Sequence, residues 1–244
     1  YIKGEANSED LLIRPRSIYD QNHITLELGL RAERIDRAQQ AVRLSDGRTI
    51  PYDRLVLATG SLCRRPAIAG LDRPGVFFLR SMADADLLRH AADRASRVVL
   101  VGGGYISLEL AASFRQQGRS VTVLEKNPRL LARVTAPEVS AFFKAVHQAE
   151  GVQILTGVEV LEITDGAPGL RVVTRGGTSY EADLVIVGTG AQPNTELARA
   201  AGLAVENGIV VDEQNRTSDP GLYAIGDCAV QYHPRYARPV RLES

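Results

Sequence analysis

The chain has 244 residues, with 29 basic and 29 acidic side chains, a formal net charge of zero and 44% hydrophobic residues. These values are typical of a folded globular protein and exclude a disordered or fibrous chain. They argue against a general nucleic-acid binder, which needs a concentrated basic face, and no apolar run approaches the roughly 18 residues of a transmembrane helix. The only cysteines, Cys63 and Cys228, cannot form a disulfide framework, so we expect a cytoplasmic protein.

The predicted elements indicate the α/β class, because short apolar strands alternate with longer amphipathic helices. Ser81 is a candidate N-cap, and Thr135 with Glu138 fits a capping box. Gly118 and Gly151 are expected to end the helices that precede them. In chain order, the pattern predicts a helix over 83–95, a strand over 98–101, a helix from the following glycines to 117, a strand over 120–125, a helix to about 149 and a strand over 222–225.

An internal repeat is the clearest organisational feature. Residues 53–60 match residues 183–190 without a gap, at an offset of 130 residues. Each copy follows a predicted hairpin with a turn glycine at the same offset, Gly47 or Gly177. Two buried strands could also look alike by chance, but the length of the match favours duplication. At this offset the counterpart of the glycine loop at Gly102 would precede Tyr1, so we expect an internal piece of a longer protein.

A candidate dinucleotide site begins at Gly102 and ends at Ser107, in the place of a G-x-G-x-x-G motif. Gly102 permits the tight turn, Gly104 lets the backbone approach a pyrophosphate, and the third position needs a small residue, here Ser107. Glu125 is expected to bind the adenosine ribose and to repel a 2′-phosphate, which favours NAD over NADP. Lys126 keeps NADP open as an alternative, and a purely structural turn is the other reading.

A second signature runs from Thr217 to Cys228. Leu222–Ile225 is predicted as a buried strand, Gly226 allows a sharp exit, and Asp227 lies at the carboxyl end, where α/β sheets bind ligands. A Gly-Asp pair alone would indicate only a turn and a helix cap. The longer string resembles the T-S-x-P-x-x-Y-A-x-G-D signature of the two-dinucleotide flavoprotein reductases, the FAD-dependent pyridine nucleotide reductases. In that family the aspartate, here Asp227, binds the ribityl chain of FAD.

Within this superfamily the chain resembles bacterial NADH-dependent ferredoxin reductases of the putidaredoxin reductase and rhodocoxin reductase type. The strings that carry the resemblance lie at residues 44–48, 52–60, 79–85, 102–109, 133–142 and 240–244. Ser107 departs from the glycine usual at its position. The resemblance also implies a first glycine motif and a C-terminal interface domain that do not occur in this sequence.

The resemblance implies a fold of two Rossmann-like domains of the three-layer ββα type. The FAD-binding domain would be discontinuous, over 1–82 and 211–244, and the NAD-binding domain would span 83–210. Because the first glycine motif is missing, the FAD domain is expected to be truncated, and this piece is expected to bind NAD but not to retain FAD tightly.

The resemblance also assigns roles to individual residues. Ile106 and Glu109 would lie beside the nicotinamide, with Glu109 as a positioning residue, although an ordinary solvated acid is the alternative for Glu109. The residues expected to contact FAD are Ala32, Thr59, Gly60, Arg80 and Asp227. The residues expected to contact NAD are Gly102, Gly104, Tyr105, Ile106, Ser107, Glu109, Glu125, Thr189 and Gly190. No metal site is expected.

The implied activity is that of a flavoprotein oxidoreductase, which passes electrons from NADH through FAD to a [2Fe–2S] ferredoxin or rubredoxin that supplies an oxygenase. Alternatives on the same scaffold are an NADH oxidase or peroxidase, a nitrite reductase flavin subunit, and a non-catalytic NAD-responsive flavoprotein. Neither a CxxC nor a C-x4-C pair is present, which argues against a disulfide relay. Cys63 and Cys228 are therefore expected to be structural.

Two groups of arginines could steer an acidic ferredoxin. One consists of Arg64, Arg65 and Arg73, and the other of Arg235, Arg238 and Arg241. The alternative is scattered, solvated surface charge.

Overall fold

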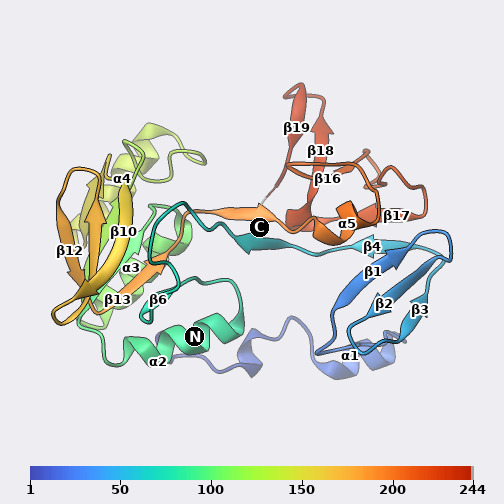
Figure 1. Cartoon of the computed structure of the whole chain (residues 1–244), viewed down its shortest axis with the longest axis horizontal. Coiled ribbons are helices and arrows are strands. Elements are labelled where there is room, and N and C mark those ends of the chain that lie inside the picture. Colours follow the sequence, from blue (N-terminus) through green and yellow to red (C-terminus); the bar gives the residue numbers. More distant parts are fainter. Residues whose placement is uncertain (243–244) are drawn as a thin grey trace. The chain divides into compact units, whose positions relative to one another are not determined.

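The computed structural model describes residues 1–242 and contains two compact units (Figure 1). Unit 1 comprises residues 1–12 and 63–190, and unit 2 comprises residues 13–62 and 191–244. The chain therefore passes from one unit to the other after residues 12, 62 and 190, whereas the cofactor domains expected from the sequence are divided after residues 82 and 210. The assignment of each segment to FAD or NAD stays a prediction.

Unit 1 is built on a five-stranded parallel sheet with the order β6-β13-β7-β8-β9. The central strands are almost continuously apolar, as expected for strands covered on both faces. Three helices belong to this unit, namely α2 (Met82–Ala92), α3 (Tyr105–Gln116) and α4 (Pro137–Ala149). The strands are β6 (Val76–Phe77), β7 (Arg97–Val101), β8 (Ser120–Glu125), β9 (Gln153–Thr156) and β13 (Leu184–Val187).

Alternate residues of the central strands face two different layers. Val98 and Leu100 of β7 belong to a core with Leu88 of α2 and Phe114 of α3. Val99 and its neighbours on the other face pack in a second core that includes residues of an antiparallel sheet. That sheet consists of β10 (Val160–Gly166), β11 (Gly169–Thr174) and β12 (Ser179–Ala182). Two sheets and one helical layer confirm the expected ββα arrangement.

The helix ends agree with the sequence at α2, although α2 stops three residues earlier than expected. Ser81 accepts a hydrogen bond from Asp84 N, and the Asp84 side chain accepts one from Ser81 N at 2.8 Å, which completes a capping box. Gly118 and Gly151, each with φ of +82°, follow the C-caps of α3 and α4 as predicted. Among the described residues, no helix is long and apolar enough to cross a membrane.

The capping box predicted for α4 is wrong. Ala136 is the N-cap and Pro137 the first helical residue, so Glu138 does not occupy the third helical position that a capping box requires. The Thr135 hydroxyl instead donates to Leu131 O at 3.3 Å. Proline suits the first helical position because its fixed φ is already helical and it lacks an N–H group.

Unit 2 combines several short sheets (Figure 1). β4 (Leu55–Leu57) pairs in parallel with β17 (Leu222–Ala224). The buried strand predicted at 222–225 therefore ends one residue earlier than expected, and Ile225 is exposed. The other sheets are β1 (Ala32–Asp36) with β2 (Ala41–Leu44) and β3 (Thr49–Pro51); β5 (Ser61–Cys63) with β14 (Ala191–Pro193); and β15 (Val205–Glu206) with β16 (Gly208–Val211), β18 (Ala229–His233) and β19 (Arg238–Val240). The short helices are α1 (Arg16–Gln21) and α5 (Glu196–Ala200).

The structure confirms the repeat and extends it. The antiparallel sheet β1-β2-β3 corresponds to β10-β11-β12, and the turn glycines Gly47 and Gly177 have φ of +87° and +78°. The strands that follow, β4 and β13, also correspond, as do β5 and β14 after them. The last residues of the matched string at 240–244, Glu243 and Ser244, lie outside the described residues.

Candidate functional site

The loop after β7 depends on three glycines for three different reasons. Gly102 has φ of +107°, and a Cβ there would stand 2.4 Å from Gly188 O. A Cβ on Gly103 would stand 2.6 Å from Leu130 Cδ2. At Gly104, by contrast, a Cβ would meet no atom within 4 Å. Gly102 and Gly103 are therefore required by packing within the chain, and the open side of Gly104 is free for a ligand. No motif in the sequence indicates the constraint at Gly103.

The start of α3 suits a phosphate group. Gly104 is its N-cap, no side chain caps it, and its first turn holds no acidic residue. Leu108 N donates to Gly104 O at 3.1 Å as the first helical bond, so the N–H groups of the turn before it have no partner inside the helix. These groups and the helix dipole favour an anion. Together with the open side of Gly104, they fit the pyrophosphate of a dinucleotide.

Glu125, at the end of β8, holds the glycine loop. Its carboxylate is buried, and Oε2 accepts a hydrogen bond from Gly103 N at 2.5 Å. Oε1 accepts from Asn127 N and Asn127 Nδ2, both at 2.6 Å. A carboxylate offers about four acceptor positions, so acceptor capacity remains for a ribose hydroxyl. The ribose contact stays a prediction, and the sequence did not indicate the role of Asn127.

Ser107 lies where α3 approaches the end of β13. The residue is 1% exposed, and within the described chain its hydroxyl has no hydrogen-bond partner. A Cβ added to Gly188 would stand 2.5 Å from Ser107 Oγ, so this hydroxyl faces the Gly188 backbone. A small residue is required at both positions, as expected for the third place of the motif.

The first turns of α3 expose Tyr105, expected to contact NAD, and the side chains of Ile106 and Glu109, expected beside the nicotinamide. Tyr105 and Ile106 are 49% and 47% exposed, which is high for large apolar groups. Glu109 is exposed as well and lies three residues after Ile106, on the same side of the helix. Their contact with nicotinamide, and the solvated-acid alternative for Glu109, both stay open.

The loop after β13 forms two hydrogen bonds with the backbone of Arg64, which follows the first repeat copy. The Thr189 hydroxyl donates to Arg64 O at 3.2 Å, and Arg64 N donates to Gly190 O at 2.9 Å. Gly190 has φ of +107°, and a Cβ on it would stand 2.8 Å from Arg133 Nη2. The left-handed backbone of Gly190 disfavours any other residue there, and the contact with the exposed Arg133 side chain was not indicated by the sequence.

The equivalent loop of unit 2 makes the same bonds. The Thr59 hydroxyl donates to Asn194 O at 2.6 Å, and Asn194 N donates to Gly60 O at 2.9 Å. Asn194 is the counterpart of Arg64 at the 130-residue offset. Each Thr-Gly loop thus binds the backbone of one residue from the other copy, an exchange that the repeat alone did not reveal.

Asp227 lies beside the Thr59–Gly60 motif. It is 5% exposed, and its Oδ2 accepts a hydrogen bond from the Ser61 hydroxyl at 2.8 Å. Gly226, with φ of +70°, makes the predicted turn, and a Cβ there would meet no atom within 4 Å. Two motifs assigned to FAD by resemblance therefore meet in unit 2. A buried carboxylate beside open space fits a polyhydroxyl chain such as that of FAD.

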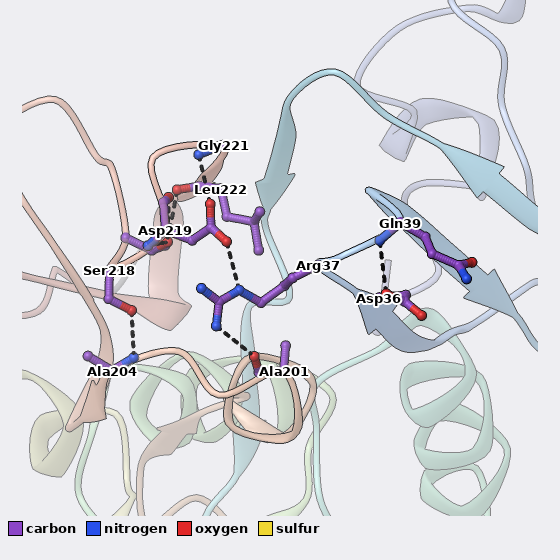
Figure 2. A network of polar contacts seen from close by, with 10 residues as sticks. Asp36, Arg37, Gln39, Ala201, Ala204, Ser218, Asp219, Gly221 and Leu222 are labelled. Atoms are coloured by element: carbon purple, nitrogen blue, oxygen red, sulfur yellow. Dashed lines mark hydrogen bonds and ion pairs between the residues drawn. The ribbon is translucent and has the colours of Figure 1, made fainter.

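The start of the same signature is fixed by Asp219 (Figure 2). Arg37 Nε donates to Asp219 Oδ2 at 2.7 Å, and Gly221 N donates to Asp219 Oδ1 at 2.9 Å. Arg37 also donates from Nη1 to Ala201 O at 3.3 Å. The Arg37 hydrogen bond lowers the pKa of Asp219 below its usual value. The segment from 217 to 228 is thus held near both ends, and the sequence did not point to Arg37.

The remaining FAD candidates, Ala32 and Arg80, belong to different units. Ala32 begins β1 in unit 2 and is exposed. Arg80 belongs to unit 1, is exposed, and donates from its backbone N–H to Asp84 Oδ2 at 3.1 Å. Their contacts with FAD stay predictions.

Both cysteines are free thiols in structural settings. Cys228 is fully buried, with its Sγ 3.2 Å from Ile225 O. Cys63 is half-buried, and burial raises the pKa of its thiol. A raised pKa disfavours the reactive thiolate form. Within residues 1–242 no cluster of side chains could hold a metal ion.

Some arginines of the two groups form ion pairs or hydrogen bonds within the chain. Arg65 pairs with Asp72 and lies 4.8 Å from the Phe78 ring centroid. Arg73 pairs with Asp165 at 2.6 Å, and Arg241 donates to Asp227 O at 3.3 Å. Arg64, Arg235 and Arg238 are exposed. Solvated, ion-paired charge therefore describes Arg65 and Arg73 well.

A parallel sheet with a glycine loop, a helix N-terminus and a following acid defines a dinucleotide-binding protein of the Rossmann type. The chain matches the pyridine nucleotide-disulphide oxidoreductase family model over residues 4–241, and it belongs to that family.

Two relatives and one solved structure are similar to the whole of this chain. It is 44% identical to putidaredoxin reductase CamA of Pseudomonas putida, over all of this chain and 59% of that protein. It is 40% identical to a rubredoxin-NAD(+) reductase of Pseudomonas putida, over all of this chain and 64% of that protein. The crystal structure of the covalent putidaredoxin reductase–putidaredoxin complex matches with a TM-score of 0.93 and 43% identity, over all of this chain and 60% of that chain. The chain thus spans about three fifths of the length of these proteins.

Proposed function

We propose that the protein is an NADH-dependent, FAD-containing reductase that passes electrons to a [2Fe–2S] ferredoxin or a rubredoxin supplying an oxygenase. The observation that carries the proposal is the presence of two acids at the carboxyl ends of parallel strands, Glu125 as the last residue of β8 and Asp227 after β17. Each lies close to a glycine with open space beside it: Asp227 follows Gly226, and Glu125 accepts from Gly103 N, the neighbour of Gly104. The names of the similar reductases support the same activity.

The chain's own residues would divide the work of binding. The backbone N–H groups at the start of α3 would hold the NADH pyrophosphate, and Glu125 would accept from the adenosine ribose. Tyr105 and Ile106 would exclude water from the nicotinamide, and Glu109 would orient it. Asp227 would accept from ribityl hydroxyls. FAD, when bound, supplies the conversion between a two-electron donor and one-electron acceptors.

The expected cellular location and the free thiols are consistent with this proposal. A cytoplasmic location belongs to the proposal, and the two free thiols, Cys63 and Cys228, support it because reducing compartments keep thiols reduced. Burial raises the pKa of the Cys63 thiol, which disfavours its thiolate form, and Cys228 is fully buried.

The decisive experiment is NADH-driven reduction of a panel of [2Fe–2S] ferredoxins and rubredoxins by the whole protein. We expect turnover with at least one carrier, followed by the change in its visible absorbance. Asp227→Ala should lower the FAD content and carrier reduction together, whereas Asp53→Ala, an exposed acid before β4, should change neither.

Other outcomes would contradict the proposal. Rapid oxygen consumption without any carrier would favour an NADH oxidase on the same scaffold. Slow reduction of the flavin by NADH, with no carrier reduced, would favour a non-catalytic NAD-responsive protein.

A further inference from the structure

Three charged side chains gather beside the residue expected to bind the adenosine ribose. Lys126 directly follows Glu125, and its Nζ lies 2.8 Å from Glu159 Oε1. Arg175 Nε pairs with the other oxygen of the same carboxylate, Glu159 Oε2. The Glu159 carboxylate is therefore paired with two cations, Lys126 and Arg175, at the same time.

The backbone fixes this acid next to the ribose site. Val158 N donates to Glu125 O at 2.9 Å, and Gly157 N donates to Asn127 O at 2.9 Å. Glu159 is the next residue along, and Arg175 N donates to Glu159 O at 2.9 Å. The position of Glu159 relative to Glu125 thus follows from main-chain bonds rather than from a flexible side chain alone.

The charges bear directly on the distinction between NADH and NADPH. These cofactors differ by a 2′-phosphate, a monoester that carries about −1.5 to −2 charges at neutral pH. Lys126 directly follows Glu125, Arg175 N donates to Glu159 O, and the side chains of both cations are paired with Glu159. The hydrogen bonds from Arg175 and Lys126 lower the pKa of Glu159 to about 2, so this carboxylate is charged at neutral pH.

We propose that Glu159 is a specificity-determining residue that disfavours NADPH by neutralising Lys126 and Arg175 beside the ribose site. Glu125 repels the 2′-phosphate directly, and Glu159 withholds the two cations that would otherwise attract it. The inference rests on the NADH site of the proposed function and adds a second residue to its selectivity. Lys126, which keeps NADP open from the sequence alone, is bound to this acid.

The test compares the binding of NAD+ and NADP+ to the whole protein by calorimetry. In Glu159→Gln, the ratio of the NADP+ to the NAD+ dissociation constant should fall about three- to tenfold, because exposed charges a few ångströms apart interact by roughly that much. The fragments 2′,5′-ADP and 5′-AMP should show the same shift. The gain should shrink at high ionic strength, where such charges are screened.

Two further variants isolate the cause. Lys126→Ala in the Glu159→Gln background should lose most of the gain in NADP+ binding. Glu181→Gln removes the same charge from another ion pair of the same antiparallel sheet, with Arg171 at 2.9 Å, and should leave the ratio unchanged. Melting temperatures close to that of the unaltered protein would show that each variant is folded.

The outcomes separate this inference from the proposed function. If NAD+ binds normally but Glu159→Gln leaves the ratio unchanged, or Glu181→Gln lowers it equally, the role of Glu159 is overturned while the NADH site stands. If neither NAD+ nor 5′-AMP binds to the unaltered protein, the NADH site and the role of Glu159 both fail.

Discussion

At the scale of single residues, two glycines of the same motif meet different requirements, one of folding and one of ligand binding. Gly102 is needed by the chain, since its φ is +107° and the Gly188 carbonyl lies where a side chain would begin. Gly104 has an ordinary φ of −85° and open space around it. The first is therefore a folding requirement, and the second is a binding requirement if a dinucleotide occupies the site.

Alanine at these two positions should have different effects. We expect Gly102→Ala to lower the free energy of unfolding by more than about 2 kcal/mol, because it combines a left-handed backbone with a steric clash. Gly104→Ala should cost less than about 1 kcal/mol, the range typical of N-cap changes, but should weaken NAD+ binding at least tenfold. Thermal melts and calorimetry measure the two effects. Equal loss of stability in both variants would contradict this division.

The sequence predicted several of these residues but not their contacts. Gly102, Gly104 and Glu125 follow from the motif and its spacing. The bond from Gly103 N to Glu125, the packing of Arg133 over Gly190 and the Arg37–Asp219 pair do not. They join segments far apart in the sequence, and no local pattern records which distant side chain meets a loop.

At the scale of elements, Asp183 links the starts of two neighbouring parallel strands, β7 and β13. Its Oδ2 accepts from Ser96 N at 3.0 Å and from Arg97 N at 2.9 Å, and its Oδ1 accepts from Arg97 Nη2 at 2.6 Å. These bonds fix the register of the central strands whose far ends carry the glycine loop and Thr189. Its counterpart in the first repeat copy, Asp53, is exposed.

We expect Asp183→Asn to lower the free energy of unfolding by about 1–2 kcal/mol, because charge-assisted bonds to Arg97 and to backbone N–H groups are weakened. The repeat-matched control Asp53→Asn should change it by less than about 0.5 kcal/mol. Urea titration of both variants measures the difference. A similar loss in both would show that the bonds of Asp183 contribute little.

The effect of Asp183 should depend on pH. Its hydrogen bond from Arg97 lowers the pKa of the folded state below the ordinary value of 3.8. A depressed pKa gives stability that is present above the unfolded-state pKa and is lost as pH falls through the folded one. The difference between the unaltered protein and Asp183→Asn should therefore be constant from about pH 5 to 7 and should shrink below about pH 4. A difference that grew on acidification would contradict the assignment.

Most elements could be predicted because their signals are local. Strands β7 and β8 are nearly unbroken apolar runs, and glycines mark the ends of α3 and α4. The start of α4 could not, since Thr135 and Glu138 fit a capping box and only the position of Pro137 as first helical residue moves the cap to Ala136. Two helix-start signals, the Thr135–Glu138 capping box and Pro137 at the first helical position, differ by one residue, and the helix follows the proline.

At the scale of the whole molecule, the net charge of zero does not tell which arginines are paired with acids and which are exposed. Of the first arginine group, Arg65 and Arg73 are paired with acids and Arg64 is exposed. Arg235 and Arg238 of the second group are exposed as well. A basic docking face for an acidic carrier therefore depends on few side chains.

Charge reversal tests these two groups. With an acidic ferredoxin at low ionic strength, Arg64→Glu combined with Arg65→Glu should lower kcat/KM about tenfold, because steering acts mainly on the rate of association. Arg235→Glu with Arg238→Glu tests the other group in the same assay, and NADH reduction of a small neutral dye is the control. If kcat/KM changes neither in the two double variants nor with salt concentration, electrostatic steering by either group is excluded.

The overall architecture was the part most accessible to prediction, because duplication made one half a guide to the other. The 130-residue offset anticipated the paired hairpins and strands, and the family resemblance implied the three layers found in unit 1. The unit boundaries after 62 and 190 were not accessible, because they depend on which contacts are densest rather than on any residue type.

The exchange between the two Thr-Gly loops also bears on which side chains could differ between the two copies. Residue 64 binds the loop of the second copy and residue 194 binds the loop of the first, so the same contact is made once in each direction. Each loop therefore needs one backbone carbonyl and one backbone N–H group from the other copy, and no particular side chain. Since the bonds use only backbone atoms of residues 64 and 194, their side chains were free to diverge into arginine and asparagine.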